Sequence, residues 1–83
     1  MPTVMRIGRL RVVIYPNDHR PAHVHVIGGG CEAVFVLNCL DGPPELRENH
    51  SFSQPELNRI GALLATELIT ICEKWRHIHG QYL

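Results

Sequence analysis

The first half of the chain alternates apolar and polar positions with a period of two, which is typical of half-buried β-strands. The pattern predicts strands over residues 9–15, 22–27 and 32–39, with Gly28-Gly29-Gly30 as a tight hairpin turn between the last two. Residues 4–7 have a weaker strand tendency, and residues 45–50 fit either a polar edge strand or a loop. The apolar face of these strands forms the predicted core: Leu10, Val12, Ile14, Val24, Val26, Ala33, Phe35 and Leu37.

The second half changes to a helical period. Ser53-Gln54-Pro55-Glu56 is a capping box, and apolar residues then recur every three or four positions. This stripe consists of Leu57, Ile60, Leu64, Leu68, Ile71, Trp75 and Ile78. It predicts one helix over residues 54–79, with Gly80 as its stop. We therefore expect a single α+β domain over residues 1–83, with a three- or four-stranded antiparallel β-meander packed on one long C-terminal α-helix.

Composition narrows the function classes. Eight basic and eight acidic side chains cancel, so the overall positive field of many nucleic-acid-binding domains is absent, although a local basic patch stays open. The three cysteines, an odd number without a C-x-x-C motif, argue against a disulfide framework and for a reducing cytoplasm. We expect Cys31, Cys39 and Cys72 to behave as small hydrophobic residues. No stretch has the length and apolarity of a signal peptide or a membrane span, which also favours the cytoplasm.

Candidate chemistry is concentrated in residues 15–26. His19, His23 and His25 lie within seven residues, and Asp18 precedes the first of them. Turn-forming residues surround His19, whereas His23 and His25 stand in the alternating strand that follows. With a period of two, both imidazoles point to the open face of the sheet, away from the core valines.

The first use of these histidines is a metal site. His23 and His25 would present two imidazoles to one ion, with His19 or Asp18 as a third ligand. Zinc is the default metal for such a set. Glu32, on the open face of the adjacent strand, is the best candidate for a fourth ligand or a water-activating carboxylate.

The second use is metal-free acid–base catalysis. Two histidines beside Asp18 are suited to the cleavage of a phosphodiester. Arg11 or Arg20 would hold the phosphate, and Tyr15 could stack on a base, which makes RNA or a nucleotide a candidate target. The third use is structural, in which the imidazoles fix the turn by hydrogen bonds or belong to a protein interface.

The open face of the sheet also carries a predicted apolar patch. Val13, Val34 and Val36 lie on it beside Tyr15 and Arg11. An apolar patch rimmed by charge indicates a protein contact, although a loop or the N-terminal segment could cover it instead. The sequence leaves self-association of the chain open.

The histidine stretch also carries a family resemblance. Tyr15, Asn17-Asp18-His19, Pro21, His23 and His25-Val26 resemble the signature of a family of small prokaryotic proteins known as domain of unknown function 4160. Ala22 and Val24 depart from the proline and the aromatic residue usual in that signature, but the three histidines match it. The resemblance implies a small neighbour-encoded partner protein, because some members are regarded as growth-inhibiting toxins of toxin–antitoxin pairs. It therefore favours a toxin, with a small nuclease or metal-dependent hydrolase and a non-catalytic protein-binding module as the alternatives.

Overall fold

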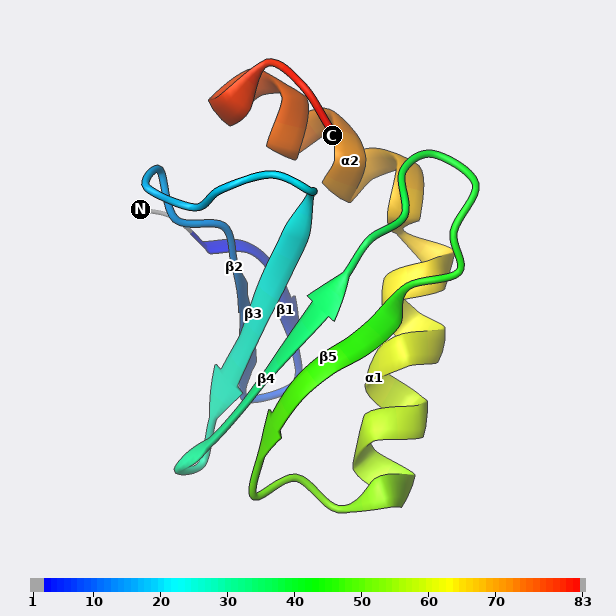
Figure 1. The fold of residues 1–83 in the computed structure, drawn as a ribbon. Helices are drawn as coiled ribbons and strands as arrows, with labels where there is room; N and C mark the ends of the chain where they lie inside the picture. The colour runs from blue at the N-terminus through cyan, green and yellow to red at the C-terminus, as the bar shows by residue number, and fades with distance from the viewer. Residues whose placement is uncertain (1–2, 83) are drawn as a thin grey trace.

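The computed structural model describes residues 3–82, which form five strands followed by two helices. The strands are β1 (Thr3–Ile7), β2 (Leu10–Val13), β3 (His23–Gly28), β4 (Cys31–Val36) and β5 (Glu45–His50). They form one antiparallel sheet in the order β1-β2-β3-β4-β5, in which every strand pairs with its neighbour in sequence (Figure 1). The α+β class and the meander are thus confirmed, but the expected three or four strands are wrong, because both uncertain segments are edge strands.

The glycine run forms the predicted hairpin turn between β3 and β4. Gly29 and Gly30 both have positive φ, +58° and +79°. Two consecutive residues of positive φ match the right-handed twist of the strands they join, and glycine adopts this conformation without steric cost. The turn fixes the pairing of β3 with β4, in which His25 lies opposite Val34.

The predicted single helix is wrong, because it is divided into α1 (Gln54–Thr66) and α2 (Leu68–His79). The expected capping box at Ser53 and Glu56 is present at the start of α1. At Glu67 the backbone leaves helical geometry, with φ −104° and ψ 18°. Next to this break the Thr66 hydroxyl donates to the Ala62 carbonyl, a contact that bends helices. The apolar stripe continues across the break from Leu64 to Leu68, so the periodicity gives no sign of it.

Both helices cover one face of the sheet and bury the core there. α1 contacts β5, whereas α2 turns toward the opposite edge and contacts β1 (Figure 1). Trp75 of α2 is fully buried, as predicted, and six of the seven stripe residues are buried. Ile78 is the exception, since 41% of it is exposed at the end of α2. The other face of the sheet carries no helix within the described residues.

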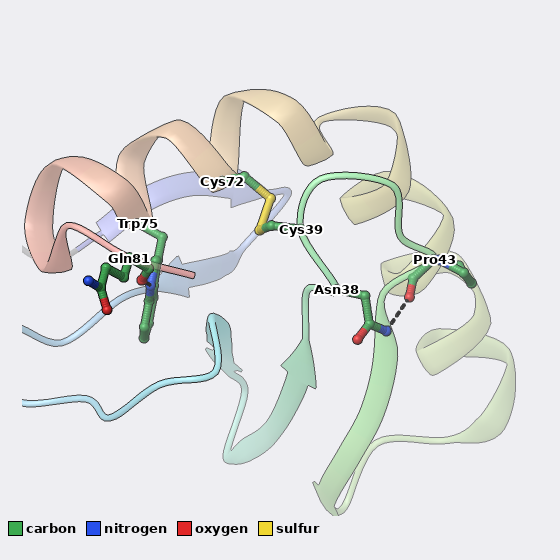
Figure 2. Close-up of a disulfide and its surroundings, with 6 residues drawn as sticks. All are labelled: Asn38, Cys39, Pro43, Cys72, Trp75 and Gln81. Atoms are coloured by element: carbon green, nitrogen blue, oxygen red, sulfur yellow. Dashed lines mark hydrogen bonds between the residues drawn. A yellow bond between two sulfur atoms is a disulfide. The ribbon is translucent and has the colours of Figure 1, made fainter. Parts of the chain in front are cut away.

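A disulfide joins Cys39, in the loop after β4, to Cys72 of α2 (Figure 2). The expectation that all three cysteines are unpaired hydrophobic residues is therefore wrong, and only Cys31 has a free thiol. Cys39 and Cys72 are separated by 33 positions, so their pairing depends on how α2 turns after Glu67. Because disulfides persist in oxidising compartments, the cysteines no longer argue for a reducing cytoplasm. Within residues 3–82 we find no helix with the length and apolarity needed to cross a membrane.

Candidate functional site

Asp18 lies in the loop between β2 and β3, and a turn holds its carboxylate in place. The backbone N–H of Tyr15 donates to Asp18 Oδ2 at 3.0 Å, and the N–H of Asp18 donates to the Tyr15 carbonyl at 3.0 Å. Aspartate commonly stabilises turns by such side-chain contacts to the nearby backbone. With Oδ2 occupied, Oδ1 is left to face the two histidines of β3.

His23 is the first residue of β3, and it is buried. Its Nδ1 lies 2.9 Å from the Pro21 carbonyl oxygen, and its Nε2 lies 3.6 Å from Asp18 Oδ1. Its ring packs against Trp75 with a centroid distance of 5.3 Å. We expected this imidazole to point to the open face of the sheet, yet only 4% of His23 is exposed.

His25 lies between two carboxylates. Its Nε2 is 3.3 Å from Asp18 Oδ1, and its Nδ1 is 3.3 Å from Glu32 Oε2. Glu32 therefore contacts the far side of the His25 ring and does not converge on the two Nε2 atoms. The Tyr15 ring meets the His25 ring edge-on at 4.9 Å. The side chains of His25 and Asp18 are 17% and 13% exposed, so solvent still reaches them.

The C-terminal residues are hydrogen-bonded to the β2–β3 loop. The indole N–H of Trp75 donates to the Gln81 carbonyl at 2.6 Å, and the Ala22 N–H donates to the Tyr82 carbonyl at 2.7 Å. His79 Nε2 lies 3.1 Å from the Tyr15 carbonyl oxygen and therefore donates to it. Figure 2 shows Gln81 beside the Trp75 ring. These bonds tie the end of the chain to both ends of the loop that carries Asp18.

Three of the predicted site residues do not join Asp18, His23 and His25. His19 is exposed and is not part of the group that could hold a metal, so of the two expected third ligands it is Asp18, and not His19, that lies beside His23 and His25. Arg20 is exposed and its guanidinium donates to the Gln81 side chain. Arg11 lies on the open face opposite Ile27, further along β2. The roles of both arginines in phosphate binding stay predictions.

The three valines of the open face do not form an exposed patch. Val13 and Val34 flank His25 in the register of the sheet, yet they are only 1% and 3% exposed. Val36, which pairs with His23, is half-buried. The expectation of a free apolar surface is therefore wrong for Val13 and Val34, which are both buried.

Asp18, His23 and His25 form what we call the Asp18–His23–His25 cluster. Each offers one ligand atom, and these atoms all lie within 4.8 Å of one another. Imidazole nitrogen and carboxylate oxygen are ligands of zinc and of other first-row divalent metals. The same atoms are also suited to acid–base chemistry, because an imidazole can accept or donate a proton while a carboxylate orients it.

A family model described as "Domain of unknown function (DUF4160)" matches residues 10–76. The chain belongs to this family. No curated protein and no solved structure matches the chain. The matched range of the DUF4160 model contains the whole Asp18–His23–His25 cluster, together with Glu32 and Trp75.

The sequence did not reveal how this DUF4160 protein supports its cluster. The Pro21 carbonyl, the Trp75 ring and the C-terminal residues all contact the cluster or its loop. Trp75 is 52 positions from His23 by their residue numbers (75 − 23), and it occupies a helical stripe that predicts only core packing. No local pattern signals such contacts, because they arise where α2 crosses the end of the sheet.

Proposed function

We propose that this protein is the toxin of a toxin–antitoxin pair and that it inhibits growth by hydrolysis at the Asp18–His23–His25 cluster. The observation that carries the proposal is the convergence of Asp18 Oδ1 on the Nε2 atoms of both histidines, at 3.6 Å and 3.3 Å. Membership in the DUF4160 family supports it, since some proteins of this kind are regarded as toxins. A small neighbour-encoded protein would be the antitoxin, and the cytoplasm would be the place of action.

The substrate class that fits this surface best is RNA or a nucleotide. Tyr15 is 38% exposed beside His25, so its ring can stack on a base. Arg11 on the open face of the sheet and the exposed Arg20 are the candidate phosphate contacts. In hydrolysis, the oxygen of water would bond to phosphorus while the ester bond breaks. A group in the cluster would take one proton from the water, and the departing oxygen would take up another.

The test is induced expression of the chain in a bacterial host, with and without the neighbouring gene. His25→Ala should abolish growth inhibition, because it removes an imidazole that solvent can reach. His50→Ala is the matched control, since this β5 histidine is exposed and belongs to no such cluster. A thermal melt of each purified variant establishes that it is folded. His23→Ala is unsuitable as the main variant, because it would leave a cavity beneath Trp75.

A folded His25→Ala variant that still inhibits growth would exclude hydrolysis at this cluster. Inhibition that needs folded protein but no histidine would instead favour the non-catalytic binding module. A chain that has no effect on growth, in the presence or absence of its neighbour, would contradict the toxin assignment itself.

A further inference from the structure

The atoms that face one another in the Asp18–His23–His25 cluster can all act as hydrogen-bond acceptors, and a cation between them would be bound by all three. The Pro21 carbonyl can only accept a hydrogen bond, so Nδ1 of His23 carries the hydrogen and donates it. In a neutral imidazole the other nitrogen, Nε2, then has a lone pair and no hydrogen. This lone pair faces Asp18 Oδ1, another acceptor, at 3.6 Å.

His25 has a carboxylate oxygen 3.3 Å from each ring nitrogen, Glu32 Oε2 beside Nδ1 and Asp18 Oδ1 beside Nε2. In the tautomer that can bind a metal through Nε2, Nδ1 carries the hydrogen and donates it to Glu32. Its Nε2 lone pair then also faces Asp18 Oδ1, at 3.3 Å. In this tautomer, two lone pairs and one carboxylate oxygen point at one another without a hydrogen between them. Each imidazole is oriented from behind by an acceptor, as metal-bound histidines almost always are.

We propose that Asp18 Oδ1, His23 Nε2 and His25 Nε2 bind one divalent transition-metal ion of the zinc class. Metal–ligand bonds of about 2.0–2.1 Å in a tetrahedral site place the ligand atoms roughly 3.3–3.4 Å apart. The observed 3.3 Å and 3.6 Å to Asp18 are close to this spacing. All three ligand atoms lie within 4.8 Å of one another.

A charged His25 is the competing explanation. An imidazolium between Asp18 and Glu32 would satisfy both nitrogens of that ring. It would leave the Nε2 lone pair of His23 facing Asp18 Oδ1 at 3.6 Å, with no hydrogen between the two atoms. Charging both rings would place two cations in rings whose centroids are 5.3 Å apart. A metal ion satisfies all three atoms at once.

The inference rests on the proposed function, because it assigns a metal to the same hydrolytic centre. Three protein ligands leave a fourth position for water, and zinc lowers the pKa of bound water to about 7, which would supply a nucleophile. Glu32, the best candidate from the sequence for a fourth ligand or a water-activating carboxylate, instead acts as a positioning residue that orients His25 from behind.

The experiment is calorimetric titration of chelator-treated protein with Zn²⁺, supported by metal analysis of the loaded chain. We expect one ion per chain and at least 100-fold weaker binding in Asp18→Asn and in His25→Ala. Glu32→Gln keeps an acceptor for His25 but loses the charge, so about 10-fold weaker binding is expected. His50→Ala is the control for adventitious binding at exposed histidines and should leave the affinity unchanged. Mg²⁺ should not compete, because it prefers oxygen ligands.

A second measurement on the metal-free protein separates the two explanations. The Asp18→Asn side chain can still accept from the Tyr15 N–H, and its amide can donate to an imidazole lone pair. If the rings are neutral, metal-free Asp18→Asn should melt at the wild-type temperature or above it. A lower melting temperature in this variant would indicate an ion pair with a His25 imidazolium in the metal-free protein. Zinc binding would then have to release that proton, so the zinc titration of wild type and Asp18→Asn decides the metal assignment.

The zinc titration tests the metal centre, and the growth assay tests the proposed function, so either can be refuted without the other. Zinc affinity equal in wild type and Asp18→Asn would overturn the metal centre, even if His25→Ala abolishes growth inhibition. One zinc ion bound by all three ligands in a chain that does not inhibit growth would refute the proposed function and leave the metal centre intact.

Discussion

The disulfide between Cys39 and Cys72 should account for a large share of the stability of this domain. It links positions separated by 33 residues, and a cross-link of that span lowers the conformational entropy of the unfolded chain. The chain-entropy relation gives about 4 kcal/mol at 25 °C for a loop of this size. Small domains have free energies of unfolding of roughly 5–15 kcal/mol, so loss of the bond would remove a major part.

The matched variants are Cys39→Ala combined with Cys72→Ala, and Cys31→Ala as the control with the free thiol removed. At about 4–8 °C per kcal/mol for a domain of this length, the double variant should melt roughly 15–30 °C below wild type. Urea unfolding with and without a reductant measures the same difference without mutation. Cys31→Ala should stay near wild type, because Cys31 is only partly buried and takes no part in the disulfide.

Three reactive thiols in the native protein, or a urea midpoint that does not respond to the reductant, would refute this reasoning. The result also bears on the proposed place of action. A reducing cytoplasm would keep both thiols free, so a toxin acting there must remain folded with the lower stability. Growth inhibition by the double variant would show that the reduced form is sufficient.

Two further predictions concern stability: one tests the burial of Val34, and the other tests the Ser53–Glu56 cap of α1. Val34→Glu should lower the free energy of unfolding, measured by urea unfolding, by about 2 kcal/mol or more, because it places a carboxylate at a site only 3% exposed. Val36→Glu, at a half-buried site, should lower it less. Equal stability of Val34→Glu and wild type would contradict the observed burial. The Ser53 backbone N–H and hydroxyl donate to Glu56 and hold the pKa of its carboxyl below the ordinary value. Because the folded-state pKa is the lower one, this stabilisation is fully present above the unfolded-state pKa of about 4.3 and is lost as the pH falls through the folded-state pKa. Glu56→Gln should therefore flatten the acid side of the stability profile. Identical profiles for Glu56→Gln and wild type would contradict the cap.

Much of the fold could be predicted from local pattern. Alternation identified the three central strands and their core faces, and the capping box placed the start of α1 at the correct residue. The break at Glu67 could not be predicted, because Leu64 and Leu68 keep the helical spacing across it. The disulfide could not be predicted either, because Cys39 and Cys72 meet only when α2 turns over the end of the sheet.

The candidate site, too, could be predicted only in part from local pattern. Period-two alternation placed His23 and His25 on one strand face, and the adjacent Asp18 was a candidate from its position alone. The choice of Asp18 over His19 as the third member depended on the turn that Tyr15 closes, which points one carboxylate oxygen at both rings. The burial of Val13 and Val34 likewise depended on their cross-strand neighbours.

The sequence by itself determined the three central strands, the faces of their side chains and the start of α1, because backbone periodicity and capping are local properties. The tertiary structure decided which atoms meet: the orientation of both imidazoles by Pro21 and Glu32, the burial of His23 beneath Trp75, and the Cys39–Cys72 bond. These contacts join residues far apart in the chain or depend on the exact direction of a lone pair. Such geometry is fixed only when helices, sheet and loops pack together, since no short stretch of sequence specifies it.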